Sequence, residues 1–396
     1  MPRRPKDGNA AARLFVADTF DGFGPSVFRA ADDELIVRHV KGKQTARLKK
    51  GVRELALCWP GVYAMLDEKK RIIYVGKAKN LRSRLLSYFR VNSRDPKAGR
   101  ILKHTRMLVW EQAADEFAAL LRELELIQRL CPRFNVLGRP GLQRHHYLCI
   151  GKSPAAYVYV VTKPTGKELG CYGPLVLRHR SEDAARRLND WFKLRDCPQT
   201  VPLAFADQPE LFSHDRAAKC LRFEIGNCAG PCVAACTRQD YGEGTRAAKA
   251  FLDGRDRAIL RKLRELMESA ACGFAFEKAM ALRDRLTALE WVDERLTLLR
   301  KARTQNSFVY PLTGADGRER WYAIHRGQVR AVVTAPATEA ERISAAALLA
   351  RTFSIGPGPR VLSDVAVDSV LLVAAWFRKN PDERAKLMKE SSLQIG

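Results

Sequence analysis

Apolar and polar positions change in a regular way from residue 52 onward. PGVYAML and RIIYVG are apolar runs rich in β-branched and aromatic residues, and the polar stretch DEKK separates them. This pattern predicts a β-hairpin. The next stretch, KAKNLRSRLLSYF, places Asn80 where it can cap a helix with Leu81, Leu85 and Tyr88 at helical spacing.

A strand is predicted next, around MLVWEQA, and then a strong helix over DEFAALLRELELIQRLC, which Pro132 ends. The order is thus β-β-α-β-α, a compact module of about one domain. The apolar stripe of the second helix consists of Phe117, Leu120, Leu121, Leu124 and Ile127.

The remaining pattern predicts an α+β protein. Residues 143–178 are β-rich, and SEDAARRLNDWF reads as a helix. Residues 240–304 are helical, and the break at Cys272–Phe274 suggests a helical hairpin. A β-like and then a helical stretch follow. The expected divisions are a basic arm (1–51) with one or two strands from LIVRHV, the β-β-α-β-α module (52–140), a β-rich and Cys-rich region (141–239), the helical region (240–304) and a C-terminal α/β segment (305–396).

Charge narrows the function classes. The 396 residues include 69 Lys and Arg against 44 Asp and Glu, a formal net charge of +25. Residues 1–150 alone hold 30 basic and 15 acidic side chains. Such an excess favours a polyanion, either nucleic acid or an anionic membrane surface, over a generically basic protein. No apolar stretch could span a bilayer and no secretory signal is recognisable, so a cytoplasmic protein with reduced cysteines is expected.

The module carries a set of side chains suited to phosphodiester hydrolysis. Tyr63 and Tyr74 lie on neighbouring predicted strands, and Arg84 and Tyr88 share one helical face. A tyrosine is a poor base unless nearby cations lower its pKa, and Lys77 and Arg84 are the obvious cations. A single carboxylate can anchor a hard cation such as magnesium. Taken singly, each of these residues is more readily explained as an ordinary strand aromatic or surface charge.

The spacing of this set resembles the GIY-YIG endonuclease family. PGVY, IYVGKAKNLRSRLLSYF and ELELIQRLCPRFNV are most similar to the N-terminal half of the UvrC family, a component of the bacterial excinuclease ABC, or to its shorter Cho-like homologue. The resemblance implies that Glu123 holds magnesium or manganese and that Tyr74 leads as general base, assisted by Tyr63 and Lys77. Arg84 and Tyr88 would then act on the phosphate, and Asn135 would hold the site together by hydrogen bonds.

Glu125 is a rival for Glu123 in the stretch RELE. The register counted back from Asn135 favours Glu123, and Glu125 falls on the helix side away from the apolar stripe.

The ten cysteines include a cluster that favours a metal over disulfides. Thiolates select soft metals, and the absence of a Cys-x2-Cys pair disfavours an ordinary zinc knuckle. The text CLRFEIGNCAGPC resembles the Cys-rich segment of the UvrC family, which implies an iron–sulfur cluster, with zinc as the alternative. The implied ligands are Cys197, Cys220, Cys228 and Cys232, and Cys236 is a fifth thiol that could replace one of them.

FEKAMALRDRLTALE resembles the helical motif that the UvrC family shares with UvrB, another component of the excinuclease, over about 265–300. Its apolar seam implies docking to UvrB, although it could instead pack on the hairpin's other arm. The seam consists of Ala275, Phe276, Ala279, Leu282, Leu286 and Leu289. Residues 305–396 lack a convincing acidic constellation for the second nuclease of full-length family members, and are expected to be a remnant of that domain.

These observations predict a metal-dependent DNA endonuclease of nucleotide excision repair, which makes one incision on the 3′ side of a lesion in DNA presented by UvrB. Two alternatives stay open: a non-catalytic DNA-binding scaffold that recruits UvrB, and a free-standing structure-specific endonuclease.

Overall fold

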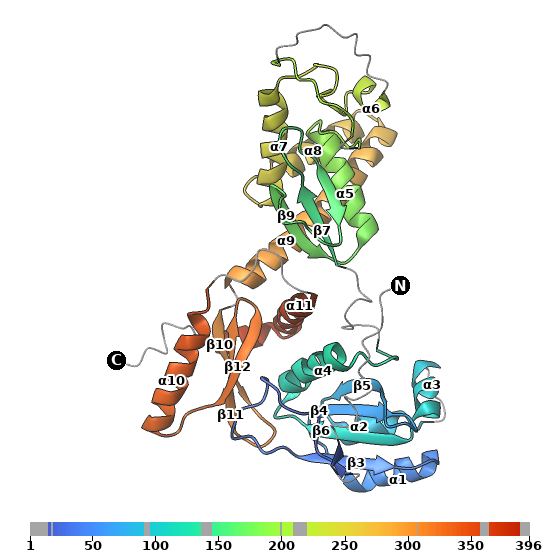
Figure 1. The fold of residues 1–396 in the computed structure, drawn as a ribbon, viewed down its shortest axis with the longest axis vertical. Coiled ribbons are helices and arrows are strands. Elements are labelled where there is room, and N and C mark those ends of the chain that lie inside the picture. Colours follow the sequence, from blue (N-terminus) through green and yellow to red (C-terminus); the bar gives the residue numbers. More distant parts are fainter. Residues whose placement is uncertain are drawn as a thin grey trace. The chain divides into compact units, whose positions relative to one another are not determined.

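The structure is a computed structural model that describes residues 15–16, 19–90, 96–135, 145–198, 200–208, 220–305, 307–356 and 364–388. The chain divides into two compact units (Figure 1). The first holds residues up to 143, residues 302–358 and the segment from 363 onward, and the second holds 144–301 and 359–362. In the described part of the chain, no helix combines the length and apolarity needed to cross a bilayer.

The first unit is built on a four-stranded antiparallel sheet of order β3-β6-β4-β5. The predicted hairpin forms β4 and β5, and the edge strand β3 comes from the N-terminal stretch expected to be an arm. A short pair, β1 (Phe15–Val16) and β2 (Thr19–Phe20), precedes it. The strands of the sheet are β3 (Val37–Lys41), β4 (Gly61–Leu66), β5 (Ile72–Ala78) and β6 (Met107–Gln112).

Helices cover both faces of this sheet, because β4 alternates between two cores. Val62 and Ala64 face the core shared with α4, whereas Tyr63 and Met65 face the core shared with α1, α2 and α3. Alternation of side chains across a strand produces this division. The sequence pattern predicted neither α1 nor α3. The helices are α1 (Thr45–Leu55), α2 (Leu81–Ser87), α3 (Pro96–His104) and α4 (Glu116–Leu130).

The C-terminal segment forms a second antiparallel sheet, of order β10-β11-β12, in the same unit. One face packs with α11 against Phe117 and Leu121 of α4, and the other face packs against α10. The elements are β10 (Phe308–Thr313), β11 (Glu319–His325), β12 (Gln328–Thr334), α10 (Glu339–Phe353), α11 (Asp364–Lys379) and the 3-10 helix η2 (Pro381–Lys386).

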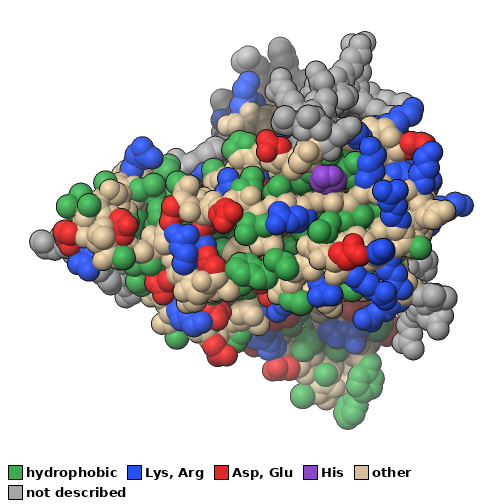
Figure 2. Space-filling view, turned by 90° about the horizontal axis from the view of Figure 1, so that it is seen from below, with side chains coloured by type: hydrophobic (Ala, Val, Ile, Leu, Met, Phe, Trp, Pro, Cys, Tyr) green, Lys and Arg blue, Asp and Glu red, His purple; other side chains and the backbone are tan. Residues whose placement is uncertain are grey.

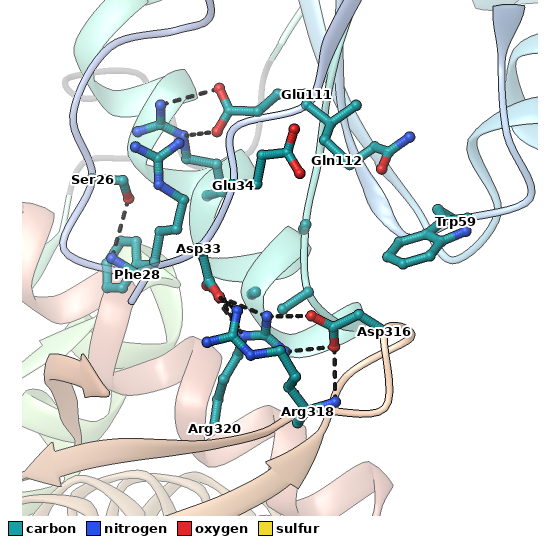
Figure 3. Close-up of a pocket in the computed structure, with 16 residues that line it drawn as sticks. Ser26, Phe28, Asp33, Glu34, Trp59, Glu111, Gln112, Asp316, Arg318 and Arg320 are labelled. Atoms are coloured by element: carbon teal, nitrogen blue, oxygen red, sulfur yellow. Dashed lines mark hydrogen bonds and ion pairs between the residues drawn. The ribbon is translucent and has the colours of Figure 1, made fainter. Parts of the chain in front are cut away.

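Polar contacts join this second sheet to the start of α4 and to the segment before β3. The Asp115 carboxylate caps α4 by accepting from the Ala118 N–H at 2.8 Å, and it also accepts from the Tyr322 hydroxyl at 2.6 Å. The Arg320 guanidinium lies between Asp33 and Asp316, as Figure 3 shows. Its Nη2 is 2.6 Å from a carboxylate oxygen of each, and all three residues line a cavity of about 250 Å³. The start of α4 is therefore fixed by residues from the far end of the chain.

The second unit contains a three-stranded antiparallel sheet of order β8-β7-β9 and a set of helices, as the pattern predicted. The helix α5 packs on β7 and β8, and α8 and α9 form the expected hairpin, separated at Gly273 to Ala275. The elements are β7 (His146–Ile150), β8 (Val158–Val161), β9 (Gly170–Leu175), α5 (Arg178–Trp191), α6 (Leu221–Glu224), α7 (Arg238–Leu252), α8 (Ala258–Cys272) and α9 (Phe276–Gln305).

Replacing Asp115 by alanine should cost more stability than losing an ordinary helix cap. The change removes the cap of α4 and leaves the buried Tyr322 hydroxyl without its acceptor, so we expect a loss of about 2–4 kcal/mol. Thr338 caps α10 at the surface through the Glu341 N–H, and Thr338→Ala should cost about 1 kcal/mol. Urea unfolding of both variants measures the difference. Equal losses would contradict the second role of Asp115.

Candidate active site

The hairpin β4–β5 positions two of the candidate tyrosines. Tyr63 lies opposite Gly76 in the register of the two strands, and Tyr74 lies two residues earlier on β5. A Cβ atom on Gly76 would lie 2.5 Å from the Tyr63 hydroxyl. Only glycine at position 76 therefore leaves room for the Tyr63 ring to lie across β5. This explains why a glycine follows Tyr74-Val75.

The helix α2 brings Arg84 and Tyr88 to the same place. Asn80 caps this helix by accepting from the Ser83 N–H, as its sequence position predicted. The Tyr63 and Tyr88 hydroxyl oxygens lie 2.9 Å apart, and Arg84 donates its Nε–H to the Tyr63 hydroxyl at 3.2 Å. The Tyr74 ring centroid lies 6.3 Å from that of Tyr63 and 6.4 Å from that of Tyr88. Three tyrosines and one guanidinium thus form a single cluster.

Two polar side chains close the outer edge of β5. The Asn135 amide accepts from the Val75 N–H and donates to the Val75 carbonyl, both at 2.9 Å. One oxygen of Glu123, on α4, accepts from the Lys77 N–H at 3.1 Å. Among the described residues, the second oxygen of Glu123 has no donor. The carboxylate is therefore fixed at the sheet edge with one oxygen available for a ligand.

The side chain of Lys77 points to a different carboxylate. Its Nζ lies 3.1 Å from Glu116, which also pairs with Lys79 at 2.6 Å. Glu116 was not singled out in the sequence, because a carboxylate in the first turn of a helix is common there for its interaction with the helix dipole. The structure therefore brings the backbone of Lys77, rather than its ammonium group, against Glu123.

Glu125 lies in a separate network of buried charges. It accepts from Arg122 Nη1 at 2.6 Å and from the Ser26 hydroxyl at 2.7 Å. The same guanidinium also pairs with the buried Glu111 at 3.2 Å. The carboxylate that the register favoured, Glu123, is the one that lies beside β5. No sequence signal indicated the Arg122 network, because its acceptors come from separate segments.

Burial governs the ionisation of this cluster. Burial raises the pKa of Tyr63, with Tyr74 acting in the same direction, and likewise raises the pKa values of Tyr74 and Tyr88. Burial also raises the pKa of Glu123 to about 6, against the opposing effects of Lys77 and Arg84. Arg84 favours ionised tyrosine but does not outweigh burial. Of the two cations expected to lower the tyrosine pKa values, Arg84 does act in that direction, and burial has the larger effect.

The predicted cysteine ligands interact electrostatically with one another, but among the described residues no three of their sulfur atoms lie within 4.8 Å of one another. Burial raises the pKa of Cys232, and the nearby Cys197 and Cys220 contribute in the same direction. The pKa of Cys228 rises for the same reasons, with Cys232 and Cys197 as neighbours. Cys236 is buried, and Cys228 is among the groups that raise its pKa to about 11.

The apolar seam of α9 divides into two parts. Leu282, Leu286 and Leu289 are buried in the core of the second unit, so this part packs on the chain's own helices. At the hairpin tip, Phe276 stays 65% exposed and the neighbouring Phe274 80% exposed.

Comparison with known proteins accounts for this arrangement. The family described as "UvrC-like GIY-YIG domain" matches residues 59–136. Residues 59–136 are a UvrC-type GIY-YIG domain. Residues 145–251 match the UvrC/Cho excinuclease middle domain, and residues 257–290 match the UvrB/uvrC motif. The resemblance seen in the sequence and the α+β fold class with its GIY-YIG module are confirmed.

Curated relatives agree with this assignment. The UvrABC system protein C of Dechloromonas aromatica (strain RCB) is 33% identical over 236 residues, which is 60% of this chain and 37% of the relative. That of Methanosarcina acetivorans is 31% identical over 244 residues, 61% of this chain and 44% of the relative. The chain therefore matches less than half the length of these relatives.

A crystal structure of the GIY-YIG N-terminal endonuclease domain of UvrC from Thermotoga maritima, bound to its catalytic magnesium, is 34% identical. It covers 22% of this chain and 98% of that chain, with a TM-score of 0.20.

Replacing Glu123 by glutamine should stabilise the metal-free GIY-YIG domain at pH 8. The pKa of Glu123 rises on folding from its usual 4.5 to about 6, so its ionised form opposes folding. This destabilisation is absent below about pH 4.5 and complete above about pH 6, where it amounts to about 2 kcal/mol. Urea unfolding in the presence of a chelator, at pH 4.5 and pH 8, measures the effect.

Glu125→Gln is the matched control for this experiment. It removes an acceptor of the buried Arg122 and should destabilise the fold instead. A loss of stability on Glu123→Gln at pH 8 would contradict the raised pKa of Glu123.

Proposed function

We propose that this chain is a metal-dependent DNA endonuclease of nucleotide excision repair, which makes a single incision on the 3′ side of a lesion in DNA presented by UvrB. The observation that carries the proposal is the cluster of Tyr63, Tyr74, Tyr88 and Arg84 beside Glu123, within a UvrC-type GIY-YIG domain. The proposal covers the endonuclease activity of the whole chain and its partners, DNA and UvrB.

Glu123 is the residue that would hold the divalent cation. It offers a half-buried carboxylate, anchored by the Lys77 N–H, with its second oxygen available. One carboxylate oxygen, with waters at the other positions, suits magnesium or manganese. When bound, the cation supplies positive charge to the non-bridging phosphate oxygens.

The roles of the other side chains follow from their placement. Arg84 is exposed on the same side as the tyrosine hydroxyls, so it can hold a phosphate oxygen. Tyr74 is the candidate general base, with Tyr63 and Tyr88 as its neighbours. Because its pKa is raised by burial, ionisation requires added positive charge nearby, which a cation at Glu123 provides. Asn135 holds the edge of β5 in place by its hydrogen bonds to Val75. The Lys77 ammonium group pairs with Glu116, so Lys77 would add positive charge beside the site.

A basic surface next to the site suits DNA. Figure 2 shows Lys and Arg side chains gathered toward one side of the face seen from below. The helix α1 and the residues before it expose Lys43, Arg47, Lys50 and Arg53, and α1 packs against α2, which carries Arg84. Phosphate contacts of this kind supply sequence-independent affinity that falls with salt.

Removing the tyrosine hydroxyl or the carboxylate should abolish incision. In a lesion-containing duplex assay with UvrB and magnesium, we expect Tyr74→Phe and Glu123→Gln each to lower the incision rate by at least about a hundredfold. Tyr310→Phe, in β10, is the control and should cut normally. Incision that survives both site variants would remove the assigned site.

The same assay separates the alternatives. Salt-dependent DNA binding without incision under any divalent cation would indicate a scaffold. Incision of damaged DNA without UvrB would indicate a free-standing endonuclease.

An iron–sulfur cluster is the ligand we propose for Cys197, Cys220, Cys228 and Cys232. The proposal is supported by the resemblance of CLRFEIGNCAGPC to the Cys-rich segment of the UvrC family and by the electrostatic interactions of Cys197, Cys220 and Cys228 with one another or with Cys232. Thiolates are the ligands that both iron–sulfur clusters and zinc select, so these cysteines would hold either group.

The hairpin tip is the surface we propose for UvrB. Phe274 and Phe276 are mostly exposed, with ring centroids 6.1 Å apart in an edge-to-face arrangement, and the exposed Met280 lies one turn further along α9. Exposed aromatic pairs are typical of interface anchors. Because Leu282, Leu286 and Leu289 are already buried within this chain, the tip, rather than the whole seam, is the part left for a partner.

Removing the two aromatic rings should weaken this association without unfolding the chain. For the double variant Phe274→Ala, Phe276→Ala we expect binding to UvrB to weaken at least about tenfold, measured by calorimetry, with unchanged thermal unfolding. Ile343→Ala, a change at a side chain 63% exposed on α10, is the control and should bind normally. Unchanged affinity of the double variant would exclude the tip.

A further inference from the structure

A second group of metal-ligating side chains lies in the middle domain, on the sheet β8-β7-β9. Cys149 on β7 pairs with Cys171 on β9 and with Tyr159 on β8, so the three side chains form one row across the sheet. Leu148 and Ile150, on either side of Cys149, belong to the core cluster that contains residues of α5. Because side chains alternate along a strand, the row lies on the other face.

The ligand atoms of this group converge. The Sγ atoms of Cys149 and Cys171 lie 2.9 Å apart. With a carboxylate oxygen of Glu168, they all lie within 4.8 Å of one another. In the part of the chain that the structure describes, this is the one set of three such side chains at that spacing.

Glu168 is held in place by the loop that precedes β9. Its Oε1 accepts from the Thr165 N–H at 2.7 Å and from the Thr165 hydroxyl at 2.8 Å. Its Oε2 is buried and accepts no hydrogen bond from the described residues. Glu168 as a whole is only partly buried, so the convergence of its carboxylate with the two sulfurs, rather than burial, points to a cation.

We propose that Cys149, Cys171 and Glu168 bind a zinc-class divalent cation. Two thiolates and one carboxylate form a borderline-soft ligand set of the kind zinc takes, and three protein ligands leave the fourth tetrahedral position for water or another donor. The cation would join β7, β9 and the loop before β9.

A disulfide between the two cysteines explains less of the structure. It would use both sulfurs but would leave Glu168 Oε2 buried without a partner. A cation gives all three groups a role, since thiolates and the carboxylate share its positive charge. This site uses none of the Cys-rich region's thiols, so the two can be tested independently.

The test is metal analysis of the full chain, purified anaerobically with reductant, together with titration by cobalt(II) as a spectroscopic substitute for zinc. We expect about one bound zinc per chain, lost in Cys149→Ser and Cys171→Ser. Glu168→Gln, which keeps the shape of the side chain, should weaken zinc binding at least about tenfold, since even outer-shell partners contribute that much. Cobalt(II) should give a thiolate charge-transfer band that these variants lack.

Two controls make the outcome specific. Cys58→Ser changes an exposed cysteine of the first unit and should retain zinc. Cys228→Ser should lose iron but retain zinc, whereas Cys149→Ser should lose zinc but retain iron. Retained iron also shows that the unit is folded.

Zinc content unchanged in Cys149→Ser and Glu168→Gln would overturn the proposal. A chain mass 2 Da below that of the fully reduced chain, measured under anaerobic conditions, would also overturn it if Cys149→Ser removed the difference. That result would identify a disulfide in place of the cation.

Discussion

The open edge of β5 is the constraint on which the active site depends. As the last strand of its sheet, β5 presents N–H and C=O groups that have no neighbouring strand, and such groups must find partners or attract another chain. Here the Phe134 N–H donates to the Ile73 carbonyl, the Asn135 amide takes both groups of Val75, and Glu123 takes the Lys77 N–H. The residues that close the edge are also those that build the site.

This double use explains why the carboxylate is fixed so well. A surface glutamate has several rotatable bonds and pays entropy to hold one position. Glu123 is held by a backbone donor on a rigid strand, so its second oxygen is directed without further cost. The same burial that fixes it also raises its pKa to about 6. The folded domain is therefore more stable with Glu123 protonated than with Glu123 ionised. A positive charge placed beside Glu123 would stabilise its ionised form.

Local features of this fold could be read from sequence. The hairpin, the Asn80 cap and the helix that ends before Pro132 all follow from spacing within a few turns or strands. The class of the domain came from the resemblance of its tyrosines, Arg84, Glu123 and Asn135 to the GIY-YIG family, which the family match over residues 59–136 confirms.

What sequence reading missed depends on distant partners. The strand predicted from LIVRHV pairs with β6, a pairing that the sequence did not indicate, and Arg122 is buried because Glu111 and the backbone near Pro25 accept from it. Cys149 and Cys171 are 22 residues apart in the chain and meet only through the β7–β9 register. The direction of the Lys77 ammonium group depends on Glu116, which one sequence could not single out.

The docking of the C-terminal sheet on α4 also sets the order of events during synthesis. Phe117, at the start of α4, contacts Tyr310, Tyr322 and Trp376. A ribosome must therefore translate some 250 further residues before the Phe117 side of α4, the helix that also carries Glu123, is covered. Domains generally fold as units in the order in which they emerge, but here the second unit, residues 144–301, can fold first. The first unit is therefore completed only after residues 144–301 of the second unit have been synthesised.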